Sequence, residues 1–136
     1  MQLNPYLMFK GTCEAAFKFY AQNLGGKITV MLTHAETPAA DQVPAEWRNK
    51  IIHARVQLGD TELMGSDSPP EHQAEMKGFS VSLTAANSAE AERMFNALAV
   101  GATVLMPLQQ TFFASRFGML TDQFGVPWMI GALPNT

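Results

Sequence analysis

The sequence predicts an α+β protein made of two tandem β-α-β-β-β modules that together form one curved mixed sheet. The same order of expected elements occurs at about 3–67 and again at about 79–131, and chance rarely reproduces every step of such an order. Each expected helix has one apolar stripe, and the expected strands alternate between apolar and polar residues. A curved sheet of this kind encloses a cavity, and we expect the function to lie there. The 136 residues then form a single domain, with 68–78 as the linker.

The first module begins with an extended run over Leu3–Phe9, followed by a helix over Thr12–Leu24. Thr12 is the expected N-cap of this helix, and Gly25-Gly26 supplies the left-handed stop. The expected buried stripe of the helix is Ala15, Ala16, Phe19, Tyr20 and Leu24. Two further strands are predicted at Ile51–Leu58 and Thr61–Ser66, joined by a tight turn at Gly59-Asp60.

The second module repeats this order with an extended run over Phe79–Thr84 and a helix over Ser88–Ala99. Asn87 precedes Glu90 by three residues, which is the spacing of a capping box. Gly101 follows the helix. The expected stripe is Ala91, Met94, Phe95 and Leu98.

Strand alternation assigns the remaining side chains to the sheet face away from the helices. In Ile51–Leu58, alternate residues from Ile52 face the helix, and His53, Arg55 and Gln57 face away. The face away from the helices also holds Tyr6, Glu62 and Ser80, among methionines. This mixture is typical of a cavity wall, and an ordinary half-exposed sheet is the alternative.

Composition excludes several classes of function. The net charge is −3 and no Lys/Arg cluster occurs, which argues against a nucleic-acid or anionic-membrane partner. The apolar runs are too short to span a bilayer, and the first residues do not resemble a signal peptide. A single cysteine fits a reducing compartment, so we expect a cytoplasmic protein. The proline-containing loop over 35–47 is expected to be either a plain surface loop or a lid.

Two segments near the end of the chain carry a family resemblance, 110–118 (QTFFASRFG) and 121–130 (TDQFGVPWMI). They resemble the closing signature of the PhnB-like group in the glyoxalase/bleomycin-resistance/dioxygenase (vicinal oxygen chelate) superfamily. The resemblance runs from Leu3 to about Gly131. Other matching stretches are Asn4–Leu7, Gly11–Ala16, Phe19-Tyr20, Ile52–Ala54 and Leu63–Asp67.

This resemblance implies the glyoxalase fold and a homodimer, to which the aromatic stretch Phe112–Phe117 would contribute. Enzymes of the superfamily hold a divalent metal in the cavity, with His, Gln or Glu ligands on the first and last strands of each module. In this chain the matching positions fall at Pro5 or Tyr6, Met64, Ser80 and Met129. These are not ordinary ligands of hard metal ions, and only Glu62, in a shifted register, would add one. The sequence therefore predicts no metal and no cofactor.

The individual candidate residues each carry two interpretations. His53 with Glu62 is a candidate acid–base pair, and the alternative is a hydrogen-bonded sheet histidine beside a carboxylate that pairs with Arg55. Arg116 would bind an anionic group or stack on neighbouring rings at an interface. Cys13 is expected to be structural. The expected ligand-binding residues are Tyr6, His53, Arg55, Glu62, Met64, Ser80, Phe113, Arg116 and Met129.

Three functions remain open from the sequence. The first is binding of a small, partly apolar ligand in the sheet cavity, without a metal. The second is an enzyme of the lyase, isomerase or oxygenase type, using His53 and Glu62 or an unrecognised metal site. The third is a structural or regulatory dimer. PhnB-like proteins are often described as demethylubiquinone methyltransferases, but a Rossmann-type methyltransferase needs a parallel sheet and a glycine-rich turn that this sequence does not predict.

Overall fold

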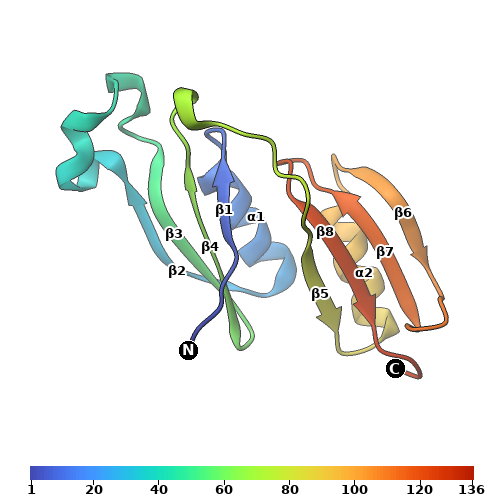
Figure 1. Cartoon of the computed structure of the whole chain (residues 1–136). Helices are drawn as coiled ribbons and strands as arrows, with labels where there is room; N and C mark the ends of the chain where they lie inside the picture. Colours follow the sequence, from blue (N-terminus) through green and yellow to red (C-terminus); the bar gives the residue numbers. More distant parts are fainter. The chain divides into compact units, whose positions relative to one another are not determined.

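The computed structural model describes all 136 residues, which divide into two compact units, Met1–Ala74 and Glu75–Thr136 (Figure 1). Each unit has the order β-α-β-β-β, so the predicted α+β class and the repeated modules are confirmed. The strands form two four-stranded sheets, one in each module, and not one continuous sheet. Their orders are β1-β4-β3-β2 and β5-β8-β7-β6.

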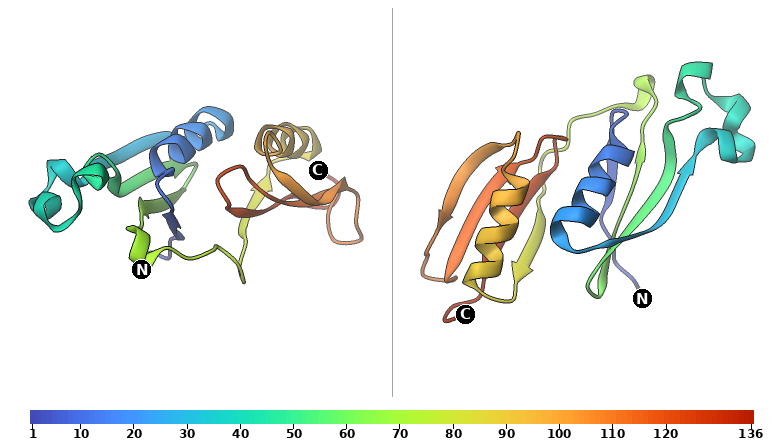
Figure 2. Two further views of the ribbon diagram at one scale, coloured as in Figure 1. Left: turned by 90° about the horizontal axis from the view of Figure 1, so that it is seen from above. Right: turned by 180° about the vertical axis from the view of Figure 1, so that it is seen from behind.

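Module one contains four strands and one long helix. They are β1 (Tyr6–Phe9), α1 (Cys13–Leu24), β2 (Lys27–Thr33), β3 (Ile51–Leu58) and β4 (Thr61–Asp67). The pair β1–β4 is parallel, and the pairs β2–β3 and β3–β4 are antiparallel. Helix α1 covers one face of this sheet, as Figure 2 shows, and leaves the other face free of helix.

Module two repeats this arrangement on its own sheet. Its elements are β5 (Val81–Ala85), α2 (Ser88–Leu98), β6 (Thr103–Gln109), β7 (Arg116–Thr121) and β8 (Pro127–Ala132). The pair β5–β8 is parallel and the other two pairs are antiparallel. Helix α2 again covers one sheet face (Figure 2). No helix in the chain has both the length and the apolar character needed to cross a membrane.

The first strand of each module is shorter or later than predicted. β1 starts at Tyr6 and not at Leu3, which is 95% exposed. Pro5 has no N–H to donate to a neighbouring strand, and only its carbonyl takes part, accepting from the Met64 N–H at 3.1 Å. Before Pro5 the contact with β4 is made by a side chain, because the Asn4 amide donates to the Glu62 carbonyl. β5 likewise starts at Val81, so Phe79 lies outside the strand and is exposed.

Helix α1 buries a stripe that differs from the predicted one. Phe17 is fully buried, whereas Ala15 is exposed and Phe19 is only partly buried. The helix contains apolar residues on more than one face, so spacing alone did not separate Phe17 from Phe19. The Phe17 ring lies over Gly65 of β4, where an added Cβ would come within 3.0 Å of it.

Helix α2 buries the predicted stripe of Ala91, Phe95 and Leu98, with Met94 partly buried. Here too a phenylalanine lies against a glycine, because a Cβ at Gly118 would approach the Phe95 ring to 2.7 Å. Trp128 and Ile130 of β8 are buried on the same side of the sheet.

The start of α1 is capped by a residue distant in sequence. Thr12 occupies the N-cap position, but its side chain makes no capping hydrogen bond. Instead the Asp67 carboxylate accepts from the Gly11 and Cys13 N–H groups through Oδ1 and from the Ile51 N–H through Oδ2, at 3.1, 2.9 and 2.9 Å. Asp67 is 3% exposed, so one buried carboxylate joins the helix start to β3 and β4.

Module two places a buried carboxylate in its last hairpin. Asp122 accepts from the Phe124 and Val126 N–H groups at 2.9 and 3.0 Å, and from the Trp128 indole N–H at 2.8 Å. The N-cap of α2 is as predicted, because the Asn87 side chain accepts from the Glu90 N–H.

The loop over 35–47 is folded into three short 3-10 turns, at His34–Glu36, Pro38–Gln42 and Ala45–Trp47. Trp47 is buried and anchors the loop. The Lys50 ammonium lies 6.0 Å from the Trp47 ring centroid and donates to the Gly11 carbonyl at 3.0 Å. These contacts fix the end of the loop to the turn that precedes α1.

Candidate functional site

The helix-free face of module one carries a row of side chains from all four strands. Register aligns Tyr6 of β1 with Met64 of β4, Met64 with Arg55 of β3, and Arg55 with Val30 of β2. Cross-strand partners point to the same side of a sheet. His53, two residues before Arg55, shares this face.

Four polar side chains on this face form a connected cluster, which we call the Tyr6 cluster (Tyr6, His53, Arg55 and Glu62). The Tyr6 hydroxyl lies 3.1 Å from His53 Nδ1, and the two rings are stacked with centroids 5.8 Å apart. Arg55 Nε lies 3.2 Å from His53 Nε2, and Arg55 Nη1 lies 3.6 Å from Glu62 Oε2. The predicted residues of module one are therefore brought together.

This geometry separates the two members of the proposed acid–base pair. Glu62 pairs with Arg55, while both ring nitrogens of His53 are already engaged by Tyr6 and Arg55. A general base needs a free lone pair within reach of its substrate. The alternative pairing of Glu62 with Arg55, which the hairpin also predicted, is the one that forms.

The helix-free face of module two has a different chemistry. Register aligns Ser82 of β5 with Met129 of β8, Met129 with Met119 of β7, and Met119 with Met106 of β6. Three thioether side chains thus stand side by side on three strands, and we call them the methionine row (Met106, Met119 and Met129). This face is soft and apolar, and a hydroxyl stands at one end of the row.

A hollow of about 150 Å³ lies beside the methionine row. Its walls combine aromatic and thioether surface with two exposed hydroxyls. The residues that carry this character are Ser82, Thr84, Phe113, Phe117 and Met129. The Phe113 and Phe117 rings meet edge to face, 5.0 Å apart, so the aromatic wall is built by mutual packing.

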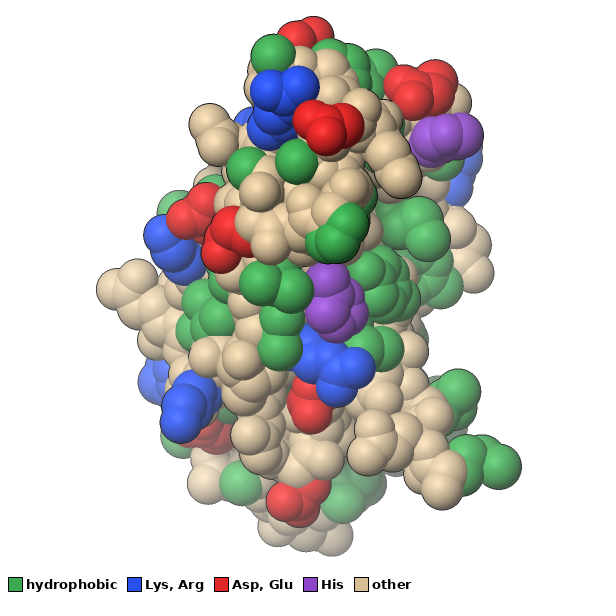
Figure 3. Space-filling model, turned by 90° about the vertical axis from the view of Figure 1, so that its left-hand side faces the viewer, with side chains coloured by type: hydrophobic (Ala, Val, Ile, Leu, Met, Phe, Trp, Pro, Cys, Tyr) green, Lys and Arg blue, Asp and Glu red, His purple; other side chains and the backbone are tan.

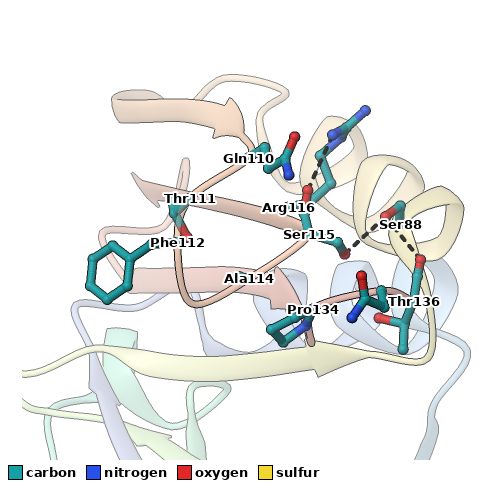
Figure 4. Close-up of a pocket in the computed structure, with 10 residues that line it drawn as sticks. Ser88, Gln110, Thr111, Phe112, Ala114, Ser115, Arg116, Pro134 and Thr136 are labelled. Atoms are coloured by element: carbon teal, nitrogen blue, oxygen red, sulfur yellow. Dashed lines mark hydrogen bonds between the residues drawn. The ribbon is translucent and has the colours of Figure 1, made fainter.

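A second, more polar hollow of about 420 Å³ lies by the start of α2 (Figure 4). The Ser88 hydroxyl bonds the Ser115 hydroxyl at 2.9 Å and the Thr136 carbonyl at 3.1 Å, and Arg116 donates to the Ser115 carbonyl. The Thr111 hydroxyl is buried without a partner. Ser88, Ser115, Arg116 and Thr136 are thus joined to one another, whereas the Thr111 hydroxyl is not part of this network.

The structure separates several residues that the sequence grouped together. Ser80 precedes β5, and the residue aligned with Met129 is Ser82, two residues further along on the same face. A strand start two residues later would have pointed to it. Arg116 lies 3.7 Å from Glu92 of α2, whereas Phe113 lines the hollow on the helix-free face.

The aligned positions do not fit a divalent metal ion. They present one phenol, two thioethers and one hydroxyl, from Tyr6, Met64, Met129 and Ser82. Hard divalent ions prefer carboxylate and imidazole ligands, and thioethers suit soft ions. No group of three or more His, Cys, Asp or Glu side chains is close enough together to hold a metal ion.

Cys13 has the environment of a structural thiol. It is fully buried at the start of α1. Burial raises the pKa of the Cys13 thiol well above its ordinary range, and the charge of Asp67 raises it further. A protonated, inaccessible thiol is a poor nucleophile.

Surface charge shows no concentrated basic patch on the side of the molecule drawn in Figure 3. Acidic and basic side chains are interspersed there, in keeping with the net charge of −3. Such a distribution gives a polyanion little to bind.

The fold of this chain is that of the glyoxalase class. At only 13% identity, a glyoxylase/bleomycin resistance protein/dioxygenase domain from Frankia sp. EAN1pec has the same fold, with a TM-score of 0.66 over 97% of this chain and 90% of that one. A family model described as 3-demethylubiquinone-9 3-methyltransferase matches residues 1–131. The chain therefore belongs to this family, which is the PhnB-like group that the sequence motifs indicated.

Similar proteins extend over the whole chain. Protein YjdN of Escherichia coli K12 is 36% identical over 98% of this chain and 96% of its own length. The crystal structure of protein PA1353 from Pseudomonas aeruginosa is 48% identical, covers 98% of both chains and has a TM-score of 0.90. A Bacillus cereus protein described as a putative 3-demethylubiquinone-9 3-methyltransferase, PhnB protein, is 28% identical over 97% of this chain and 99% of that chain, with a TM-score of 0.82.

Proposed function

We propose that this protein binds a small, partly apolar molecule on the helix-free faces of its sheets, without a metal ion. The observation that carries this proposal is the hollow beside the methionine row. Binding sites for small molecules are typically concave and apolar, with a few polar groups that orient the ligand. The walls of this hollow match that description.

The size of the hollow limits what it accepts. Its volume of about 150 Å³ is that of an engineered apolar cavity that holds benzene. A ring-sized apolar group fits, with the Ser82 and Thr84 hydroxyls available for one polar substituent. Methionine side chains are flexible and polarizable, so the wall can adapt to ligands of different outline.

The donor set at the aligned strand positions supports binding without a metal. Catalytic zinc normally needs about three protein ligands of the imidazole, thiolate or carboxylate type. The test is elemental analysis of protein purified without chelators or a metal-affinity tag. We expect less than about one tenth of a metal ion per chain, which is about an order of magnitude below a filled site. Stoichiometric zinc, nickel or iron, lost in Glu62→Ala, would contradict the proposal.

We do not propose methyltransferase activity for this chain, although the matching family model carries that description. Both sheets are mixed and have four strands, with one parallel pair each. They differ from the open, mostly parallel sheet whose glycine-rich turn holds a nucleotide cofactor in Rossmann folds.

An acid–base enzyme centred on the Tyr6 cluster is the second candidate function. The observation that favours it is the exposure of Tyr6, whose hydroxyl also lies 3.1 Å from His53 Nδ1, so that Tyr6 and not His53 would exchange a proton with a substrate. Turnover of a ligand that stabilises the protein would distinguish this enzyme from a binding protein.

We further propose a cytoplasmic homodimer, with the exposed rings of Phe112–Phe117 at its interface.

The binding proposal is tested by blocking the hollow. A library of ring-containing metabolites is screened by thermal shift, and compounds that raise the melting temperature are titrated against Thr84→Phe. This variant places a ring in the hollow at an exposed strand position, so it should abolish the shift without loss of folding. Thr103→Phe, at an exposed strand threonine outside the hollow, is the matched control. If both variants respond like the wild type, the hollow is not the site.

A further inference from the structure

The Tyr6 cluster fixes the tautomer of a histidine. An arginine side chain is always a hydrogen-bond donor, so Arg55 Nε–H, 3.2 Å from His53 Nε2, requires an unprotonated nitrogen there. Neutral imidazole then carries its hydrogen on Nδ1. This Nδ1–H group faces the Tyr6 hydroxyl at 3.1 Å.

Tyr6 must therefore act as the acceptor in its contact with His53. A phenol has one hydrogen to donate as well as lone pairs to accept. Because His53 donates to the oxygen of Tyr6, the Tyr6 hydrogen is left without an acceptor in the chain. Tyr6 is 40% exposed on the helix-free face, so this hydrogen is available to a bound molecule.

We infer that the Tyr6 hydroxyl donates a hydrogen bond to the carbonyl oxygen of an uncharged, largely apolar ligand, and that Arg55 and His53 are positioning residues that orient this donor. The inference extends the proposed binding function to the helix-free face of module one, and names the ligand class and the residue that recognises it there. Accepting a hydrogen bond polarises a hydroxyl, so the bond from His53 strengthens the donor power of Tyr6.

The surroundings of Tyr6 favour an uncharged ligand. Glu62 lies 3.6 Å from Arg55, so these two charges compensate each other, and a ligand carboxylate would meet the Glu62 carboxylate. Apolar side chains also lie beside the Tyr6 cluster on this face. Met64 and Val30 stand in the same row as Tyr6, and Met8, two residues along β1, is exposed. A ligand with a carbonyl group on an apolar frame would offer one acceptor to the Tyr6 hydroxyl and apolar surface to these side chains.

The tautomer is tested directly by nitrogen NMR. At pH 8, where ordinary imidazoles are neutral, ¹⁵N shifts from long-range proton–nitrogen spectra report which ring nitrogen carries the hydrogen. The His53 signal is assigned by its disappearance from the spectrum of His53→Gln. We expect the His53 ring to carry its hydrogen on Nδ1. Arg55→Met should move the hydrogen to Nε2, and Arg48→Met, at an exposed arginine outside the cluster, should not. Protonated Nε2 in the wild type would overturn the inference.

The donor role is tested with a pair of fluorinated probes, 4-fluoroacetophenone and 4-fluorotoluene, followed by ¹⁹F NMR titration. Only the first has a carbonyl oxygen. Tyr6→Phe keeps the ring and removes the hydroxyl. It should therefore lower the affinity for 4-fluoroacetophenone about threefold to tenfold and leave the affinity for 4-fluorotoluene unchanged. Arg55→Met should lower the affinity for 4-fluoroacetophenone by a smaller factor.

Each other result decides against the inference. Equal weakening of both probes by Tyr6→Phe would mean that Tyr6 contributes only packing. Binding of neither probe would show that this face does not take a carbonyl compound. The binding proposal itself is decided separately, by the thermal-shift screen and the Thr84→Phe variant, because these do not involve Tyr6.

Discussion

Replacing Asp67 by asparagine should destabilise module one although the side chain keeps its size. The carboxylate accepts three backbone N–H groups, two through Oδ1 and one through Oδ2. In Asp67→Asn the amide oxygen can keep the bonds from Gly11 and Cys13, but the amide nitrogen then faces the Ile51 N–H, donor against donor.

The magnitude follows from these three contacts. Hydrogen bonds to charged groups contribute about 1.5–3 kcal/mol each, so Asp67→Asn should cost about 2–3 kcal/mol of unfolding free energy. Asp67→Ala leaves all three donors unsatisfied. The Cys13 and Ile51 N–H groups are buried, and at about 1–3 kcal/mol for each of these two groups the total is about 2–6 kcal/mol. That is a large part of the about 5–15 kcal/mol that stabilises a typical domain.

Urea unfolding, followed by tryptophan fluorescence and far-UV circular dichroism, measures this loss. Trp47 lies in module one and reports on the loop that precedes β3. Asp60→Asn in the exposed β3–β4 turn is the control, and it should stay within about 0.5 kcal/mol of the wild type. If Asp67→Asn were as stable as Asp60→Asn, the buried carboxylate would not be the cap that holds α1.

Gly118→Ala should destabilise module two by about 1–3 kcal/mol, because the new Cβ meets the Phe95 ring at 2.7 Å and the Leu108 backbone at 3.1 Å; thermal unfolding measures it, and an unchanged melting temperature would contradict the packing. Cys13 should react with iodoacetamide far more slowly in the native protein than in urea, because burial raises the pKa of its thiol. Above about pH 8.5 the thiol therefore ionises only in the unfolded chain. The contribution of Cys13 to stability is fully present below about pH 8.5 and is lost as the pH rises above that value. Mass spectrometry of alkylated protein and urea midpoints at pH 7 and 9.5 check both statements, and rapid native labelling would refute them. Light scattering should give about twice the chain mass of 14.9 kDa, and Phe112→Ser, at a ring that is 98% exposed, should weaken the dimer; a wild-type monomer at micromolar concentration excludes it.

Local patterns predicted the modules and the faces of their strands well. Alternation with period two places Leu7 and Phe9 against α1 and His53 on the opposite face, because it depends only on neighbours in the chain. The Glu62–Arg55 contact was among the expected alternatives because a tight turn sets the register of its hairpin.

What the sequence did not predict depends on residues far apart in the chain. The carboxylate that caps α1 is 54 residues from the Cys13 N–H, and nothing near Thr12 announces it. The Tyr6 contact with His53 joins residues 47 apart. The start of β1 is an exception with a local cause, because Pro5 has no N–H to donate and pairing begins at Tyr6, although β4 extends back to Thr61. The methionine row depends on the register of three strands, including a bulge in β6, which spacing does not reveal.

The methionine row also makes one face of the protein sensitive to oxidants. Met106, Met119 and Met129 are each partly exposed and stand on adjacent strands. Peroxide converts a thioether to a sulfoxide, which turns a flexible apolar side chain into a polar one, and sulfoxide reductases reverse the change. Oxidation of this row would replace apolar surface by sulfoxide dipoles across three neighbouring strands. The affinity of this face for apolar molecules would then depend on how oxidising its surroundings are.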